Sequence, residues 1–202
     1  MTVKQFISRK TAKIRYSLMY KLIKNVTPCM KFRVKDNPRA MTTFLKKTFG
    51  NTPLTGVEIG VAFGVNALSI CKMLNMKKLI LIDPYIPYKQ DGVLWTHFIN
   101  DPTTILNKLS GFNIEFINKK SENAIHDINE PLDFVYIDGN HDYPYVKKDL
   151  ELYYPKIKKH GVIGGHNFEI EYPGVAKASI EFAEENHLNL DGERYDFWIV
   201  KK

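Results

Sequence analysis

Strand-like and helix-like segments alternate along most of this chain, and that alternation limits its fold more than any other feature. From residue 56 onward, apolar strand-like runs near 56–61, 78–83, 113–118, 133–138 and 161–166 alternate with helix-like segments near 65–76, 92–109, 121–127, 144–156 and 174–187. The segments Leu188–Asp191 and Phe197–Val200 follow as an antiparallel pair. Such alternation predicts a Rossmann-like, doubly wound α/β fold: a mainly parallel sheet with an antiparallel C-terminal strand and ligands at the carboxyl ends of the strands.

Basic residues are concentrated at the N-terminal end of the chain. Residues 1–50 hold thirteen of the 29 Lys and Arg residues but only one of the 22 acidic residues, Asp36. Apolar residues recur there at helical spacing, which predicts an amphipathic helix with a basic face from about Val3 to Val26. A second helix is predicted from about Arg39 to Phe49. We therefore divide the chain into a basic helical N-terminal extension, 1–50, and one α/β domain, 51–202.

The role of the basic extension has several interpretations. A helix that covers the α/β domain and keeps its lysines in water is the simplest of them. The same charge also suits contact with a membrane surface or a nucleic acid, or a lid that attracts an anionic substrate. All of these interpretations stay open from the sequence.

Composition excludes several classes of protein. With 202 residues, 44% of them hydrophobic, the chain can bury one large core and has no segment of disordered composition. The sequence has no uninterrupted apolar stretch that would serve as a signal peptide or cross a bilayer. Cys29 and Cys71 lack the spacing of a metal site, which favours ordinary thiols in a reducing compartment. We expect a cytoplasmic protein.

Two glycines follow the first predicted strand, in the segment Val-Glu-Ile-Gly-Val-Ala-Phe-Gly at 57–64. Gly60 and Gly64 let the backbone pass close to a ligand, because no Cβ stands in the way. The spacing Glu-x-Gly-x-x-x-Gly differs from Gly-x-Gly-x-x-Gly, which brings a pyrophosphate onto a helix N-terminus. A pyrophosphate is therefore not expected, and Glu58 beside this turn suits a cationic amino group instead.

A second acid, Asp83, ends the next predicted strand nineteen residues beyond Gly64. Its carboxylate can accept hydrogen bonds from two ribose hydroxyls. An amino group at Glu58 and a ribose at Asp83 together describe S-adenosylmethionine, which we predict as the cofactor. The alternative is that these acids only cap helices or add surface charge.

The fourth and fifth predicted strands bring further polar groups to the same edge. Asp138 ends one strand and is followed by His141, while His166 and Asn167 end the other. The carboxylate of Asp138, the imidazole of His166 and the amide of Asn167 can converge on one divalent cation, and imidazole favours Mn²⁺, Fe²⁺, Co²⁺ or Zn²⁺ over Mg²⁺. Without a metal, His141 or His166 is the candidate base. Each of these residues can also serve only to cap or order its loop.

Several blocks of this sequence resemble a known family. Residues 136–143 read Tyr-Ile-Asp-Gly-Asn-His-Asp-Tyr, 146–150 read Val-Lys-Lys-Asp-Leu, and 159–166 read Lys-His-Gly-Val-Ile-Gly-Gly-His. Over about residues 54–200 the chain resembles class I S-adenosylmethionine-dependent methyltransferases of the macrocin O-methyltransferase-like type, methyltransferase domain 24. The first fifty residues have no counterpart that we can name.

The resemblance implies a role for individual residues. By it, Glu58, Gly60 and Gly64 line the cofactor, Asp83 holds the ribose, Ser121 and Glu122 lie near the adenine, and Asp138 lies at the methyl-transfer centre. Similar catechol-type methyltransferases bind a metal with an Asp and then an Asp-Asn pair, whereas this chain has His166 and Asn167 at the second position. A metal held there would bind a substrate oxygen and make its hydroxyl easier to deprotonate.

These features together predict an S-adenosylmethionine-dependent methyltransferase. We expect O-methylation of a small-molecule hydroxyl, on a sugar or secondary metabolite, assisted by a divalent metal such as Mg²⁺ or Mn²⁺. One alternative is methyl transfer to RNA or another polyanion held by the basic extension. Another is a non-catalytic module that binds a partner or a membrane. The sequence leaves the acceptor unidentified and is compatible with a homo-oligomer.

Overall fold

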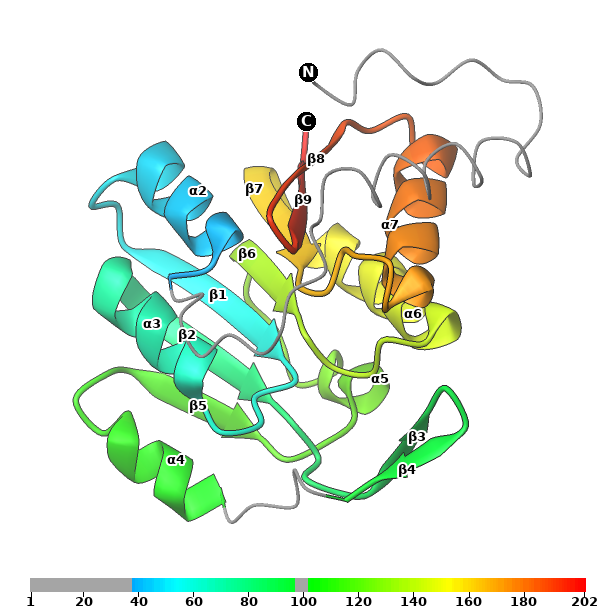
Figure 1. Ribbon diagram of the computed structural model, residues 1–202. Helices are drawn as coiled ribbons and strands as arrows, with labels where there is room; N and C mark the ends of the chain where they lie inside the picture. The colour runs from blue at the N-terminus through cyan, green and yellow to red at the C-terminus, as the bar shows by residue number, and fades with distance from the viewer. Residues whose placement is uncertain (1–37, 97–101) are drawn as a thin grey trace.

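A seven-stranded sheet covered by helices forms the centre of the computed structural model, which describes residues 38–96 and 102–202 (Figure 1). The strand order is β5-β2-β1-β6-β7-β9-β8. The parallel strands are β1 (Leu54–Ile59), β2 (Met76–Ile82), β5 (Ile114–Ile117), β6 (Leu132–Ile137) and β7 (Ile157–Gly165). The antiparallel strands β9 (Asp196–Val200) and β8 (Leu190–Glu193) complete the sheet. The predicted fold class is confirmed, while the predicted helix from Val3 to Val26 lies outside the described residues.

Helices lie on both faces of the sheet (Figure 1). They are α2 (Ala40–Phe49), α3 (Val65–Met73), α4 (Pro102–Lys108), α5 (Ser121–Ala124), α6 (Tyr143–Tyr153), the short 3₁₀ helix η2 (Tyr154–Lys156) and α7 (Pro173–Glu185). Two separate apolar cores result, because successive side chains of a strand point to opposite faces. In β6, Phe134 and Tyr136 pack with α2 and α3, whereas Val135 and Ile137 pack with α6 and α7. The helix predicted at 39–49 is confirmed as α2, which packs on the sheet.

The segment after β2 differs from the prediction. A helix was expected over 92–109, but the chain forms a hairpin of β3 (Tyr88–Gln90) and β4 (Val93–Trp95) before α4. The two residues that join these strands, Asp91 and Gly92, have φ angles of 50° and 75°. Asp-Gly is a strong signal for such a two-residue hairpin turn, because both positions require positive φ. The rings of Tyr88 and Trp95 stack across the hairpin with centroids 6.5 Å apart.

Within the described parts of the chain, none of the helices combines the length and apolar character needed to cross a membrane.

Candidate active site

The carboxyl ends of four parallel strands lie side by side at one edge of the sheet. Ile59 of β1 is in register with Ile82 of β2 and with Ile137 of β6, and Ile137 is in register with Gly165 of β7. The segments that carry the predicted site residues leave the sheet just beyond these positions. The structure therefore brings the ends of these strands together at one edge, where open α/β sheets bind their ligands.

The two glycines of the β1–α3 loop are required by packing. Gly60 has φ +83°, and a Cβ there would lie 2.2 Å from the carbonyl oxygen of Asp138. Gly64 has φ +69°, and a Cβ there would lie 2.6 Å from the Ile105 side chain. Positive φ strains residues with a Cβ, so both positions favour glycine even without a ligand. This close approach sets the β1–α3 loop directly against the end of β6.

Glu58 is buried in β1, and only one of its carboxylate oxygens has a hydrogen-bond partner in the described part of the chain. Its Oε1 accepts a hydrogen bond of 3.0 Å from Nδ2 of Asn66. Its Oε2 and the Oδ1 of Asn66 are inaccessible and have no hydrogen-bond partner among the described residues. Burial raises the pKa of Glu58 to about 8. Because buried acceptors normally find donors, this pair of oxygens fits a ligand that brings N–H groups, such as an ammonium.

Asp83 connects the loops that follow β1 and β2. Its Oδ2 accepts hydrogen bonds from the backbone N–H of Val61 at 2.9 Å and of Ala62 at 3.1 Å, and its Oδ1 accepts one from Tyr85 at 2.8 Å. The hydroxyl of Tyr85 donates to the Ala62 carbonyl at 2.9 Å. A carboxylate offers about four acceptor positions, so a ribose would use the remaining one or displace a backbone donor. The sequence did not indicate this structural role.

Ser121 and Glu122 attach α5 to α6. The Ser121 hydroxyl donates to Oδ1 of Asp149 at 2.5 Å, and burial raises the pKa of Asp149 to about 7. Glu122 forms an ion pair of 2.6 Å with Lys148 at the surface. The amide of Asn118, just before α5, donates to the Asp83 carbonyl at 3.0 Å. This bond connects the segment before α5 to the end of β2, while the predicted contact of Ser121 and Glu122 with adenine stays a prediction.

Asp138 forms an ion pair with a residue that the sequence did not single out. The Nη1 atom of Arg39 lies 2.6 Å from Oδ2 of Asp138, and Nε2 of His141 lies 3.5 Å from Oδ1. Burial acts to raise the pKa of Asp138, but the Arg39 charge outweighs it and holds that pKa well below its usual range. Asp138 is therefore an anion at neutral pH and a weak base.

His166 forms a dyad with Asp196, a second residue that the sequence did not single out. Its Nδ1 lies 2.7 Å from Oδ1 of Asp196, which is 2% exposed. The same carboxylate accepts hydrogen bonds from the Tyr136 hydroxyl at 2.9 Å and from the Met41 amide at 2.8 Å. A carboxylate at Nδ1 fixes the proton there and leaves Nε2 of His166 as the acceptor.

The loop that carries His141 is bonded to the β3–β4 hairpin. The His141 backbone N–H donates to Oε1 of the buried Gln90 at 3.0 Å. Nδ2 of Asn140 donates to the Lys89 carbonyl at 2.8 Å. His141 also packs on Tyr172, with ring centroids 4.7 Å apart. The hairpin thereby holds the loop next to Asp138.

The predicted metal ligands are engaged with other protein groups. Asp138 pairs with Arg39, Nδ1 of His166 pairs with Asp196, and Nδ2 of Asn167 donates to Glu169 at 3.2 Å. In the described ranges, no three His, Cys, Asp or Glu residues gather in a way that could hold a metal ion. With a guanidinium on Asp138, this donor set does not fit a divalent cation.

The sequence alone does not point to Arg39 and Asp196, because each contacts a residue that is far from it along the chain. Arg39 lies 99 residues before Asp138, and Asp196 lies 30 residues after His166. Only Asp196 left a usable signal. It directly precedes a predicted strand, and pairing that strand with the one before His166 would have placed the two residues opposite each other.

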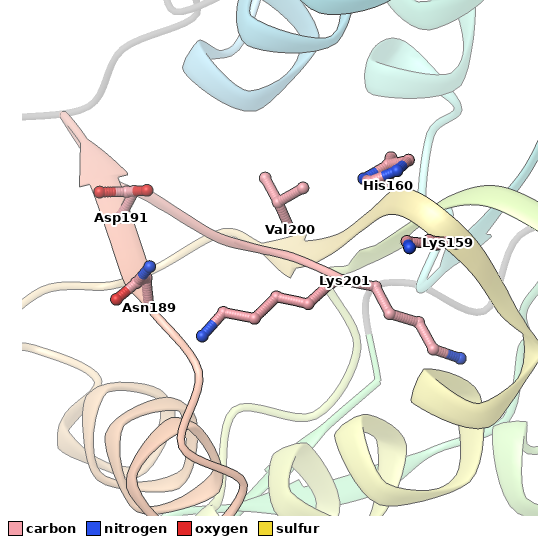
Figure 2. A pocket seen from close by; sticks show the side chains of 7 residues that line it. Lys159, His160, Asn189, Asp191, Val200 and Lys201 are labelled. Carbon is pink, nitrogen blue, oxygen red and sulfur yellow. The ribbon is translucent and has the colours of Figure 1, made fainter.

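A hollow of about 420 Å³ lies beside β7, β8 and the C-terminal end of β9 (Figure 2). Its lining residues are Lys159, His160, Asn189, Asp191, Val200, Lys201 and Lys202. Lys201 is held by its own contacts, because its Nζ donates to the Ile157 carbonyl at 2.7 Å. None of the predicted site residues lines this hollow.

Comparison with known proteins found a family model and a viral relative that match this chain. The chain matches the family model Methyltransf_24, described as "Methyltransferase domain", over residues 57–168. It is 33% identical over 124 residues to an uncharacterized protein of Acanthamoeba polyphaga mimivirus, a match that covers 59% of this chain and 53% of the viral protein. The chain thus spans about half the length of that relative.

Solved structures show the same fold. CalS11, a calicheamicin methyltransferase, is 11% identical with a TM-score of 0.62, over 99% of this chain and 96% of that one. An O-methyltransferase from Bacillus cereus in complex with SAH is 14% identical with a TM-score of 0.59, over 98% and 95% of the two chains.

Proposed function

The chain belongs to the methyltransferase-domain family, and we propose that it transfers the methyl group of S-adenosylmethionine to a hydroxyl oxygen of a small molecule. The observation that carries this proposal is the buried Glu58 carboxylate beside the glycine loop, whose Oε2 has no donor among the residues that the structure describes. The structural match CalS11 is described as a TDP-rhamnose 3'-O-methyltransferase. We extend that to propose a sugar or other secondary-metabolite hydroxyl as the acceptor.

Four residues are proposed to hold the cofactor. Glu58 and Asn66 offer its ammonium group two oxygens that have no partner within 38–96 and 102–202. Asp83, at the end of the neighbouring strand, offers its remaining lone pair to the ribose. Ser121 begins α5 after β5, the next strand in the sheet beyond β2, and is proposed to lie near the adenine. When bound, S-adenosylmethionine supplies an electrophilic methyl group on a sulfonium and leaves as S-adenosylhomocysteine.

His166 is the proposed general base. Its Nε2 takes the hydroxyl proton, while Asp196 on Nδ1 stabilises the imidazolium that forms. Asp138 is a poor base because the Arg39 charge keeps its pKa low. His141 is the second candidate, since its Nε2 lies 3.5 Å from Asp138. A metal is not needed in this scheme, because the proton goes to an imidazole.

Calorimetric titration with S-adenosylmethionine and S-adenosylhomocysteine tests the proposal. The full chain should bind both, and Glu58→Gln should weaken binding by roughly tenfold or more, because a charge-assisted hydrogen bond is lost. Glu115→Gln is the matched control, since Glu115 pairs with Lys78 at the surface. Absence of binding to the unaltered chain at millimolar ligand would refute the proposed cofactor.

RNA or another polyanion is the second candidate acceptor, favoured by the thirteen basic residues among positions 1–50. Its test is the binding of single-stranded RNA to the full chain at low and moderate salt, because counterion release makes such binding strongly salt-dependent. RNA binding that does not depend on salt would contradict this second candidate.

Liposome flotation of the full chain, without methyl transfer to any acceptor, would instead favour a non-catalytic membrane-binding module.

A further inference from the structure

We propose that the Arg39 guanidinium occupies the position next to Asp138 where the sequence predicted a divalent metal. The guanidinium, and not a metal ion, then supplies the positive charge at the proposed methyl-transfer centre. The inference rests on the proposed function and adds a residue to its chemistry. It begins from the position of Arg39 directly before α2, opposite the end of β6.

Arg39 is held at Asp138 by several independent contacts. Its Nη1 donates to Oδ2 of Asp138 at 2.6 Å and to the Tyr136 hydroxyl at 3.2 Å. The guanidinium carbon lies 5.5 Å from the centroid of the Tyr136 ring, a cation–π distance. The side chains of Arg39 and Asp138 are only 19% and 16% exposed. The ion pair is therefore shielded from solvent, unlike an exposed surface pair.

This position of Arg39 conflicts with a metal on Asp138. A guanidinium cannot lose its proton to make room for a second cation, so a metal on this carboxylate would face a permanent positive charge. The second oxygen of Asp138 already faces His141 at 3.5 Å. Asp138 would have to leave Arg39 before it could serve as a ligand, which would leave the largely buried Arg39 charge poorly compensated.

The same contacts suit Arg39 to the task otherwise given to a metal. Nη1 alone makes the bonds to Asp138 and Tyr136, so Nη2 and Nε are not used in them. These N–H groups can donate to the acceptor oxygen as negative charge develops on it. The acceptor proton passes to Nε2 of His166, and the oxygen forms its new bond to the methyl carbon as the carbon–sulfur bond breaks.

Manganese binding to the full chain tests this without any acceptor. Electron paramagnetic resonance should show that the unaltered protein binds no Mn²⁺ with a Kd below the millimolar range. The Arg39→Met variant should show a new Mn²⁺ site. Arg39→Lys keeps the charge and should not bind Mn²⁺. Lys47→Ala, which removes a positive charge near the other end of α2, should also leave Mn²⁺ unbound.

Two results would overturn the inference. One is tight Mn²⁺ binding to the unaltered protein that Asp138→Asn abolishes. The other is an Arg39→Met variant that folds, as judged by thermal unfolding, and still binds no Mn²⁺. If Arg39→Met does not fold, the unaltered protein and Asp138→Asn decide by themselves.

Methyl transfer from labelled S-adenosylmethionine to a library of sugar and phenolic hydroxyls gives a second readout. Exhaustive chelation should leave the rate unchanged, whereas Arg39→Gln should lower kcat more than it raises KM. Loss of activity on chelation that Mn²⁺ restores would overturn the role of Arg39 and leave the methyltransferase function standing. Failure of the cofactor to bind would refute the proposed function, but it would not affect the manganese-binding test of Arg39.

Discussion

The Nδ1 atom of His166 lies 2.7 Å from Oδ1 of Asp196. His166 directly follows β7, and Asp196 is the first residue of β9, the antiparallel neighbour of β7. Asp196 also accepts hydrogen bonds from Met41, which belongs to α2, and from Tyr136, which belongs to β6. Two elements, α2 and β6, thus fix the carboxylate of Asp196, and that carboxylate fixes the tautomer of the His166 imidazole.

Asp196→Asn should lower kcat by roughly 10²-fold or more, because an amide can donate to Nδ1 and so favour the wrong tautomer. The pH–rate profile and the ¹⁵N shifts of His166 measure both effects. Tyr136→Phe is the control, since it removes one donor from Asp196 but leaves the bond to His166. Equal losses in the two variants, with no change in tautomer, would show that Asp196 is only structural.

Glu58→Gln should change how stability depends on pH. Burial raises the pKa of Glu58 from 4.5 to about 8, so between these values the unfolded chain releases a proton that the folded chain keeps. Stability of the unaltered protein should therefore fall as pH rises through this window, by something on the order of 3 kcal/mol. Urea unfolding at pH 5 and pH 9 should show this fall in the Glu115→Gln control and a smaller one in Glu58→Gln. Identical pH profiles of stability in the two variants would show that the pKa of Glu58 is not raised by burial.

The sequence predicted the sheet and its strand ends well because they follow from local pattern. The continuous apolar run 134–137 in β6 serves two cores, one on each face of the sheet, and such a run is visible without any structure. The helix predicted over 92–109 was wrong where β4 forms, because the turn at Asp91 and Gly92 was overlooked. That turn gives the hairpin its register, which local apolar content does not reveal.

The site was predicted less completely than the fold. Asp138 and His166 were visible because each follows an apolar strand. Their partners, Arg39 and Asp196, come from other elements, and only the packing of α2 on the sheet and the pairing of β9 with β7 bring them close. A pattern search along the chain finds residues at strand ends, but it does not find the charges that neutralise them.

Gly60→Ala should destabilise the fold by roughly 3 kcal/mol or more, because it adds both positive-φ strain and a contact with the backbone of Asp138. Gly92→Ala separates the two effects. Gly92 has φ +75°, but no described atom lies within 4 Å of an added Cβ, so this substitution should cost only about 1 kcal/mol. Thermal unfolding of both variants measures the difference. Equal costs would mean that the close approach of β1 and β6 is not tight.

Gln90→Ala should loosen the loop beside Asp138. It removes the acceptor of the His141 N–H, and an unsatisfied buried donor costs about 1–3 kcal/mol. Hydrogen exchange at the His141 amide should speed up accordingly. Lys89→Ala, in the same hairpin, keeps the backbone carbonyl that Asn140 uses and should leave this exchange unchanged. Unchanged protection in Gln90→Ala would show that the hairpin does not hold the loop.

Arg39→Met should destabilise the protein by roughly 3–5 kcal/mol at neutral pH, because it leaves the mostly buried Asp138 carboxylate without its countercharge. The loss should shrink when Asp138 is Asn, so a double-mutant cycle should report a coupling of about 1–3 kcal/mol.

The pH dependence of stability is an independent test of the ion pair between Arg39 and Asp138. Because the pKa of Asp138 is lowered from 3.8, the ion pair contributes fully above that value and is lost as pH falls through the lowered pKa. Urea unfolding at pH 7 and pH 3 should therefore show a larger difference between Arg39→Met and the unaltered protein at pH 7. A coupling near zero, or a difference that grows in acid, would mean that Arg39 and Asp138 do not stabilise each other.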